Sequence, residues 1–160
     1  MSDRHRLFMI SGTDVIRTAC LRWRKSATSA TPRPQFVYLK QDELIKLLLQ
    51  CDLYVHASDM ESEAISCIEA FATGLVPVIA NSELSATRQF ALDDRSLFLP
   101  GNPKDLARAI DYWLDNPQER ECMEKAYVKA AKKYSLDISV RMFEEMLNEE
   151  IEEQKGNYRI

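Results

Sequence analysis

Short apolar runs alternate along this chain with segments of helical periodicity. Because parallel neighbours in a sheet need a crossover connection, strands separated by helices predict βαβ units. The runs are apolar at consecutive positions, as expected when both faces of a sheet are covered. We therefore predict an α/β fold with a doubly wound parallel sheet. Its strands are expected at Leu7–Ser11, Gln35–Leu39, Asp52–His56, Val76–Ala80 and Ser96–Leu99.

Helices are predicted between these strands and after the last of them. Two late helices start at Asn102-Pro103 and Asn116-Pro117, where an N-cap side chain precedes proline at the first helical position. Ser135 is expected to cap a final helix, so residues 117–160 form a helical C-terminal extension. The earlier helices are predicted at Asp14–Lys25, Asp42–Cys51 and Glu61–Thr73, with loops at Ser26–Pro34 and Ala57–Met60.

Composition fits one globular domain spanning residues 1–160, with 46% hydrophobic and 29% charged residues. The net charge of −4 argues against nucleic acid as a partner. This average hides an asymmetry, because residues 1–40 contain eight Lys/Arg and two Asp/Glu. The remainder of the chain is therefore acidic.

The four cysteines form no CxxC pair and lie inside apolar segments at Cys20, Cys51, Cys67 and Cys122. They are predicted to be reduced core residues of a cytoplasmic protein, and neither a zinc site nor a disulfide framework is expected. The sequence shows no signal peptide, and its apolar runs are too short to span a bilayer. The basic, aromatic segment Leu21–Lys25 fits either a peripheral contact with the inner face of the membrane or a solvated helix face.

The segment from Glu61 to Ala70 carries two carboxylates, Glu61 and Glu69, in a predicted helix that is otherwise apolar. A glutamate in such a helix is costly unless a polar group meets it, and we interpret that group as the hydroxyls of a nucleotide sugar. Ser62, Ser66, Glu69 and Thr73 form one polar stripe at helical spacing, which equally fits a face turned to water. One histidine without a second ligand nearby predicts no metal site.

Ligands of open parallel sheets bind outside the carboxyl ends of the strands. Four such ends are Gly12-Thr13, Tyr38–Gln41, His56–Glu61 and Ala80–Leu84. The loop after His56 leads into a helix N-terminus, whose free N–H groups favour an anion such as a diphosphate. Gly12 would let the backbone pass close to a ligand, although a tight turn explains this glycine equally well.

The stretch from His56 to Ile79 resembles the E-x7-E segment of retaining GT-B glycosyltransferases. The resemblance includes Glu61, Glu69-Ala70 and the Gly74-Leu-Val-Pro77 turn, and upstream it includes Phe36, Asp42-Glu-Leu and Cys51–His56. Leu84–Leu92 and Arg95–Phe98 look like a bacterial branch associated with capsular polysaccharide and lipid glucosylation, including cholesterol α-glucosyltransferase. The resemblance implies a single Rossmann-like half of a GT-B fold, the C-terminal donor-binding domain.

By this resemblance, the enzyme transfers a hexose, expected to be glucose, from a UDP-sugar to a polysaccharide or lipid acceptor. The transfer would retain the configuration at the anomeric carbon. Glu61 and His56 would be the catalytic residues, with Glu61 near the anomeric carbon. Glu69 would bind the ribose hydroxyls. The remaining donor-binding residues would be Glu63, Ala64, Ile65 and Ser66 around the diphosphate, and Gly12, Phe36, Tyr38 and Leu39 toward the base. No cofactor besides the UDP-sugar substrate is implied.

The sequence departs from the family in three places. Ser62-Glu63-Ala64 replaces a glycine-rich turn between the glutamates, and Val37 stands where relatives often have glycine. The chain matches only the donor half, so an N-terminal acceptor-binding domain would be a further partner. Arg17, Arg22, Arg24 or Arg88 could approach the diphosphate in place of the family's Arg/Lys pair.

Two alternatives to a complete transferase stay open. One is a non-catalytic nucleotide-sugar-binding module, or a half-enzyme that needs a separate acceptor domain. The other is a different doubly wound protein, such as an epimerase-like or regulatory domain, that shares only the architecture.

Overall fold

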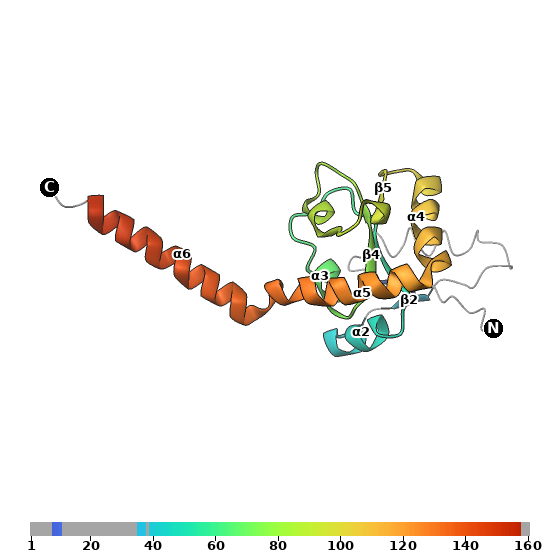
Figure 1. Ribbon diagram of the computed structural model, residues 1–160, viewed down its shortest axis with the longest axis horizontal. Helices are drawn as coiled ribbons and strands as arrows, with labels where there is room; N and C mark the ends of the chain where they lie inside the picture. Colours follow the sequence, from blue (N-terminus) through green and yellow to red (C-terminus); the bar gives the residue numbers. More distant parts are fainter. Residues whose placement is uncertain (1–7, 11–34, 38, 158–160) are drawn as a thin grey trace. The chain divides into compact units, whose positions relative to one another are not determined.

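The computed structural model describes residues 8–10, 35–37 and 39–157 of the 160-residue chain. Its elements are drawn in Figure 1. The chain divides into two compact units, residues 1–52 and residues 53–160. We treat each unit separately.

The first unit contains two short parallel strands and one helix. Strand β1 (Phe8–Ile10) pairs with β2 (Gln35–Val37) so that Met9 lies opposite Phe36. Helix α2 spans Gln41–Leu48 and begins where the Lys40 backbone N–H donates to the Glu43 carboxylate at 3.1 Å. Both strands and this helix confirm sequence predictions. The predicted helix Asp14–Lys25 and the Ser26–Pro34 loop lie outside the described residues.

The second unit is built on a three-stranded parallel sheet in the order β3-β4-β5. The strands are β3 (Leu53–His56), β4 (Val76–Ala80) and β5 (Leu97–Phe98). Leu53 lies opposite Val76, and Ile79 lies opposite Leu97. Every residue of the central strand β4 is buried, which explains its unbroken apolar sequence. The predicted α/β class with parallel strands is confirmed.

Three helices accompany this sheet: α3 (Ile65–Ala72), α4 (Pro103–Asp115) and α5 (Pro117–Ala131). They surround the sheet in Figure 1. Phe71 of α3, Trp113 of α4 and Tyr127 of α5 are almost fully buried. The Phe71 ring centroid lies 5.7 Å from that of Tyr127, so aromatic contacts join α3 to α5. The connection from β4 to β5 contains only the short 3-10 helices η1 (Ala86–Phe90) and η2 (Asp94–Ser96).

The two Asn-Pro helix starts were predicted correctly, but only the first is capped as expected. The Asn102 side chain accepts hydrogen bonds from the Lys104 and Asp105 N–H groups. At the start of α5, the Asn116 side chain instead donates backward to the Tyr112 carbonyl at 2.8 Å. It therefore closes the end of α4, because the two helices meet at this residue with no intervening loop.

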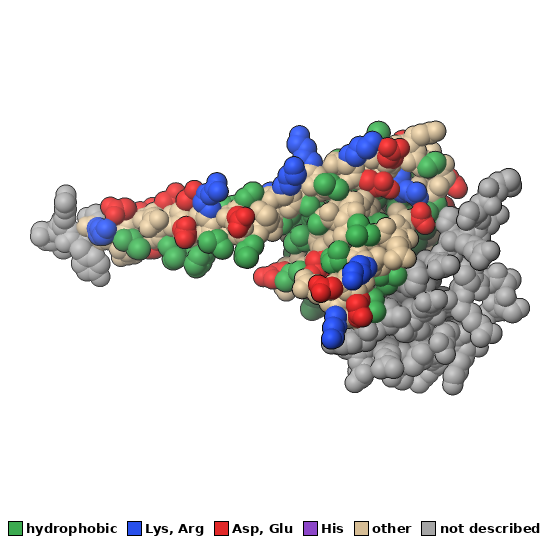
Figure 2. All heavy atoms as spheres, turned by 90° about the horizontal axis from the view of Figure 1, so that it is seen from below, with side chains coloured by type: hydrophobic (Ala, Val, Ile, Leu, Met, Phe, Trp, Pro, Cys, Tyr) green, Lys and Arg blue, Asp and Glu red, His purple; other side chains and the backbone are tan. Residues whose placement is uncertain are grey.

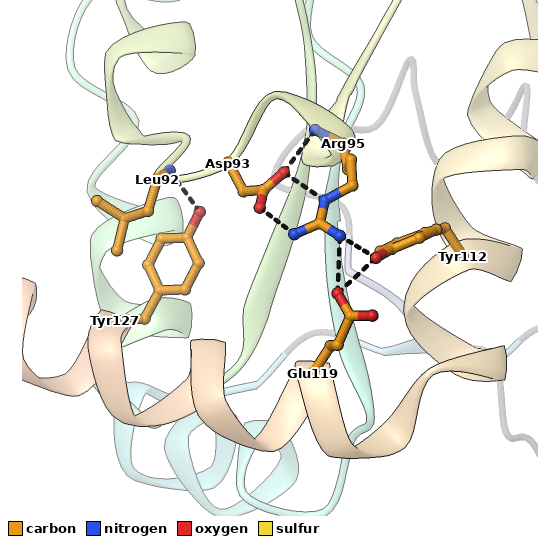
Figure 3. Close-up of polar contacts among 6 residues, drawn as sticks. All are labelled: Leu92, Asp93, Arg95, Tyr112, Glu119 and Tyr127. Atoms are coloured by element: carbon orange, nitrogen blue, oxygen red, sulfur yellow. Dashed lines mark hydrogen bonds and ion pairs between the residues drawn. The ribbon is translucent and has the colours of Figure 1, made fainter.

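A surface cluster of polar side chains joins η2, α4 and α5 (Figure 3). Arg95 donates to Asp93 at 2.8 Å and to Glu119 at 2.7 Å, and it also contacts the Tyr112 hydroxyl. The hydrogen bonds to Arg95 lower the pKa of Asp93, and the contact with Asp93 raises the pKa of Arg95. The pKa of Glu119 is lowered first by the hydrogen bond that the Tyr112 hydroxyl donates and then by Arg95. Because the pairs are exposed, they are expected to orient the elements more than to stabilise them.

The last helix, α6 (Leu136–Asn157), begins directly after Ser135, as predicted. All its residues up to Lys155 are exposed. Figure 2 shows hydrophobic side chains along this helix, with acidic side chains beside them. In the part of the chain that the structure describes, no helix is long and apolar enough to cross a membrane.

The cysteine prediction holds only in part. Cys67 is buried and Cys51 is half-buried, and both carry free thiols. Cys122 is exposed, so its assignment to the core is wrong, because it lies on the outer face of α5. Cys20 lies outside the described residues.

Candidate functional site

The carboxyl ends of β3 and β4 lie at the same edge of the second unit's sheet, because the strands are parallel and adjacent. The loops that leave these ends are bonded to each other. The Ser82 hydroxyl donates to the Asp59 carbonyl at 2.7 Å, and the Ala86 N–H donates to the Glu61 carbonyl at 2.9 Å. Glu61 also forms a parallel β-bridge with Ser85. This edge is where open parallel sheets bind ligands.

Glu61 occupies a fixed position in this joined pair of loops. Its backbone is held by the bridge to Ser85, and its carboxylate accepts a hydrogen bond from the Ser62 N–H at 3.2 Å. The side chain is half-buried. The prediction that Glu61 heads a helix is therefore wrong, because the chain stays extended here and α3 begins four residues later.

The late start of α3 follows from the backbone of Ala64. This residue has a φ of 49°, in the left-handed region, and it alone among the described non-glycine residues has a positive φ. A left-handed residue cannot continue a right-handed helix backward, so the helix starts at Ile65. Ala64 thus takes the conformation that a glycine in this turn would adopt without strain.

Three predicted diphosphate contacts lie around this helix start. Glu63 is exposed, Ala64 is buried at 6% exposure, and Ile65 is 61% exposed. The first N–H groups of any helix have no intrahelical acceptor and point outward along its axis. In α3 these belong to Ile65 and the residues next to it, so the chain has an anion-attracting helix end directly after Glu61.

Only part of the predicted polar stripe of Ser62, Ser66, Glu69 and Thr73 lies on one helix face. Ser66 and Glu69 lie one turn apart on α3, whereas Ser62 precedes the helix. Thr73 ends the helix by donating to the Ala70 carbonyl at 2.7 Å. Glu69 is half-buried, and its charge adds to the rise in the pKa of Tyr54 on β3, which burial causes in the main.

His56, the last residue of β3, is buried at 8% exposure. Its Nδ1 lies 3.1 Å from the Tyr54 hydroxyl, which donates to the Ser66 hydroxyl at 3.0 Å. Burial lowers the pKa of His56, and the nearby Glu61 opposes this effect. Burial also raises the pKa of Tyr54 to about 12, so both side chains are neutral at pH 7.

Tyr54 is a site residue that the sequence analysis missed. The available signal was its spacing of two from His56, which puts both side chains on one face of β3. Its hydroxyl joins that strand to Ser66 on α3 and so connects two residues of the predicted site, His56 and Ser66.

The residues predicted near the base belong to the first unit. Gly12 and Tyr38 lie outside the described residues, as do Arg17, Arg22, Arg24 and the segment Leu21–Lys25. Phe36 pairs with Met9 through the backbone of β2, and Leu39 is half-buried just after that strand. Arg88 is described, and it is exposed in η1.

The site offers hydrogen-bond acceptors and a helix end, which suits a ligand that carries both hydroxyls and negative charge. Within residues 8–10, 35–37 and 39–157, no group of three His, Cys, Asp or Glu side chains could hold a metal ion. Glu61 lies four residues before α3 and Glu69 within it, and each carboxylate can accept hydrogen bonds from hydroxyl groups.

Comparison with known proteins gives two findings. The model of the family described as glycosyl transferases group 1 matches residues 24–153. Among solved structures, the catalytic domain of cholesterol-alpha-glucosyltransferase from Helicobacter pylori is similar, with 46% sequence identity and a TM-score of 0.68. That similarity covers 80% of this chain and 79% of the other. A comparison with curated proteins gave no match.

Proposed function

Since the chain belongs to the glycosyl transferases of group 1, we propose that it binds a nucleotide-sugar donor at the carboxyl ends of β3 and β4 for retaining hexosyl transfer. The predicted fold, a Rossmann-like GT-B glycosyltransferase domain, agrees with the solved relative. The observation that supports the proposal is that Glu61 and Glu69 are both half-buried, Glu61 in the loop at the carboxyl ends of β3 and β4 and Glu69 in the helix that follows that loop.

The two carboxylates would act on different parts of the donor, as in the E-x7-E enzymes that the sequence resembles. Glu69 accepts hydrogen bonds from the ribose hydroxyls of the nucleotide. Glu61 contacts hydroxyls of the sugar and stabilises positive charge that develops at the anomeric carbon. Hydrogen bonds to an ionised carboxylate are directional and stronger than those between neutral groups, which suits recognition of hydroxyl pairs.

The departing nucleoside diphosphate would gain its stabilisation from the start of α3. The N–H groups of Glu63, Ala64 and Ile65 lie at or beside the positive end of the helix dipole. The donor itself supplies the phosphates, and the proposal needs no further cofactor. Gly12, Phe36, Tyr38 and Leu39 of the first unit would line the base.

The donor and acceptor are proposed from the relative. That relative is a cholesterol α-glucosyltransferase, and at 46% identity we infer UDP-glucose as donor. The acceptor is a lipid or polysaccharide hydroxyl, and the branch that the sequence resembles includes enzymes of capsular polysaccharide synthesis. A cytoplasmic enzyme that contacts the inner membrane face would meet such acceptors.

We propose further that turnover needs an acceptor-binding domain next to this donor domain. The E-x7-E enzymes act between two such domains, and alignment of two reactants can supply roughly 7–11 kcal/mol of a barrier. Without that partner, the chain would serve as a nucleotide-sugar-binding module. An assay of glucose transfer with and without a supplied acceptor domain distinguishes the two.

Calorimetric titration with UDP and with UDP-glucose tests the donor site. The wild-type chain should bind both, and Glu69→Gln should weaken both by about tenfold to a hundredfold, because a hydrogen bond to a charged group contributes about 1.5–3 kcal/mol. Glu61→Gln should weaken UDP-glucose more than UDP. Glu149→Gln on the exposed helix α6 makes the same charge change away from the site and serves as the control. Absence of UDP binding to the wild-type chain would overturn the proposal.

A further inference from the structure

A chain of three hydrogen-bonding side chains leads from α3 to the end of β3. The Tyr54 hydroxyl donates to the Ser66 hydroxyl at 3.0 Å. A tyrosine hydroxyl has one hydrogen, and when that hydrogen is directed at Ser66, the tyrosine oxygen accepts from His56 Nδ1 across the 3.1 Å contact. In this arrangement Nδ1 carries the proton of the imidazole ring.

This arrangement fixes the chemistry of the other ring nitrogen. In a neutral imidazole one nitrogen donates and the other accepts, so Nε2 of His56 carries a lone pair. Nε2 is buried, and it has no hydrogen-bond partner in the described structure. A buried acceptor without a partner is rare and costs free energy, so a purely structural histidine explains this atom poorly.

Burial, and not the charged groups around it, keeps the His56 ring neutral at physiological pH. Burial lowers its pKa, and Glu61 is the charged residue that acts on it in the opposite direction. Glu69 influences the site through Tyr54. The neighbouring strand β4 contributes no titratable side chain.

We propose that Tyr54, held by Ser66, is a positioning residue that fixes His56 in its Nδ1-protonated form, so that Nε2 accepts a hydrogen bond from a hydroxyl of the donor sugar. The inference rests on the proposed function and gives His56 a role as acceptor, not as acid. The sugar is the relevant part of the donor because Glu61, the carboxylate assigned to it, is the charged group that acts on His56. Nε2 is covered in the unliganded protein, so contact requires a local opening at the end of β3.

Titrations of UDP and UDP-glucose against matched variants test this inference. His56→Leu and Tyr54→Phe should each lower the affinity for UDP-glucose about five- to tenfold, as expected for one net hydrogen bond. Both should leave the affinity for UDP unchanged. His56→Gln, whose amide oxygen can occupy the position of Nε2, should retain most of the affinity for UDP-glucose.

A spectroscopic readout separates positioning from packing. In two-bond ¹H–¹⁵N correlation spectra, wild-type His56 should show the Nδ1-protonated form, and the Nε2 resonance should move with UDP-glucose but not with UDP. Tyr54→Phe should give a mixture of both ring forms while the protein stays folded. Because this variant keeps the aromatic ring, it answers the question even where His56→Leu fails to fold.

The outcomes also separate this inference from the proposed function. If UDP binds and depends on Glu69, but His56→Leu and Tyr54→Phe bind UDP-glucose like the wild type, the inference is wrong and the donor site stands. A protonated Nε2 in the wild-type spectrum would likewise overturn it. If UDP itself does not bind, the donor site fails first.

Discussion

At the scale of single residues, His56 shows how burial at the end of a strand sets the pKa of a side chain. Its ring is enclosed by the fold, yet it lies next to the carboxylate Glu61 and is bonded to Tyr54. The enclosure opposes protonation, and the carboxylate favours it. Burial is the larger of the two effects, so the net pKa is lowered.

This balance predicts how the stability of the protein depends on pH. The unfolded chain takes up a proton on His56 near pH 6.5, whereas the folded protein resists protonation. Stability is therefore fully retained above about pH 6.5 and decreases as the pH falls below that value, because the unfolded state binds more protons. Urea unfolding at pH 7 and pH 5.5 should show a loss that His56→Gln abolishes.

His5→Gln is the control, because it removes the only other histidine of the sequence. The paired carboxylates Asp93, Asp105 and Glu119 have lowered pKa values, so they lose their contributions in a more acidic range. An equal pH dependence in the wild type and His56→Gln would contradict the assigned cause.

At the scale of elements, the start of α3 is the feature that the sequence could not predict. The spacing of apolar residues suggested a helix from Glu61, and the carboxylates fitted its polar face. The structure starts α3 at Ile65 because Ala64 adopts a left-handed backbone, and nothing in the side chain of alanine signals that conformation. By contrast, Asn102-Pro103, Asn116-Pro117 and Gly74 mark their helix ends through local chemistry, and these boundaries were predicted correctly.

Glycine substitutions at two buried alanines test the backbone of this helix start. Ala70 lies inside α3 with no exposed surface, so Ala70→Gly should cost about 1–2 kcal/mol from helix propensity and lost burial. At Ala64, glycine also relieves the strain of the left-handed backbone, by about 1–2 kcal/mol, and this gain offsets a loss of similar size. Ala64→Gly should therefore change the free energy of unfolding by less than about 1 kcal/mol, as measured by chemical denaturation. A cost at Ala64 equal to that at Ala70 would show that the left-handed conformation is not strained.

At the scale of the whole molecule, apolar patterning identified β3, β4 and the residues at their ends, because a buried parallel strand has a distinctive sequence. The residues expected to contact the base belong to the first unit, where Phe36 is the central residue of β2. Long-range bonds such as Ser82 to Asp59 could not be predicted, because no local pattern records which loops meet.

Donor binding should protect the start of α3 from amide hydrogen exchange. If the N–H groups there hold the diphosphate, UDP should slow exchange at Ser66–Ile68, as measured by mass spectrometry. The total stabilisation at a ligand concentration of one hundred times Kd should be about 2.7 kcal/mol. Unchanged exchange at Ser66–Ile68 in the presence of bound UDP would show that the diphosphate is held elsewhere.

The bonds between the two loops have a consequence for attempts to redesign this protein. Because Ala86 and Ser85 hold the backbone of Glu61, substitutions at residues 82–86 are expected to shift Glu61 and so alter the proposed donor site. A directed-evolution library can therefore be restricted to those five codons. It would also leave both glutamates of the motif in place.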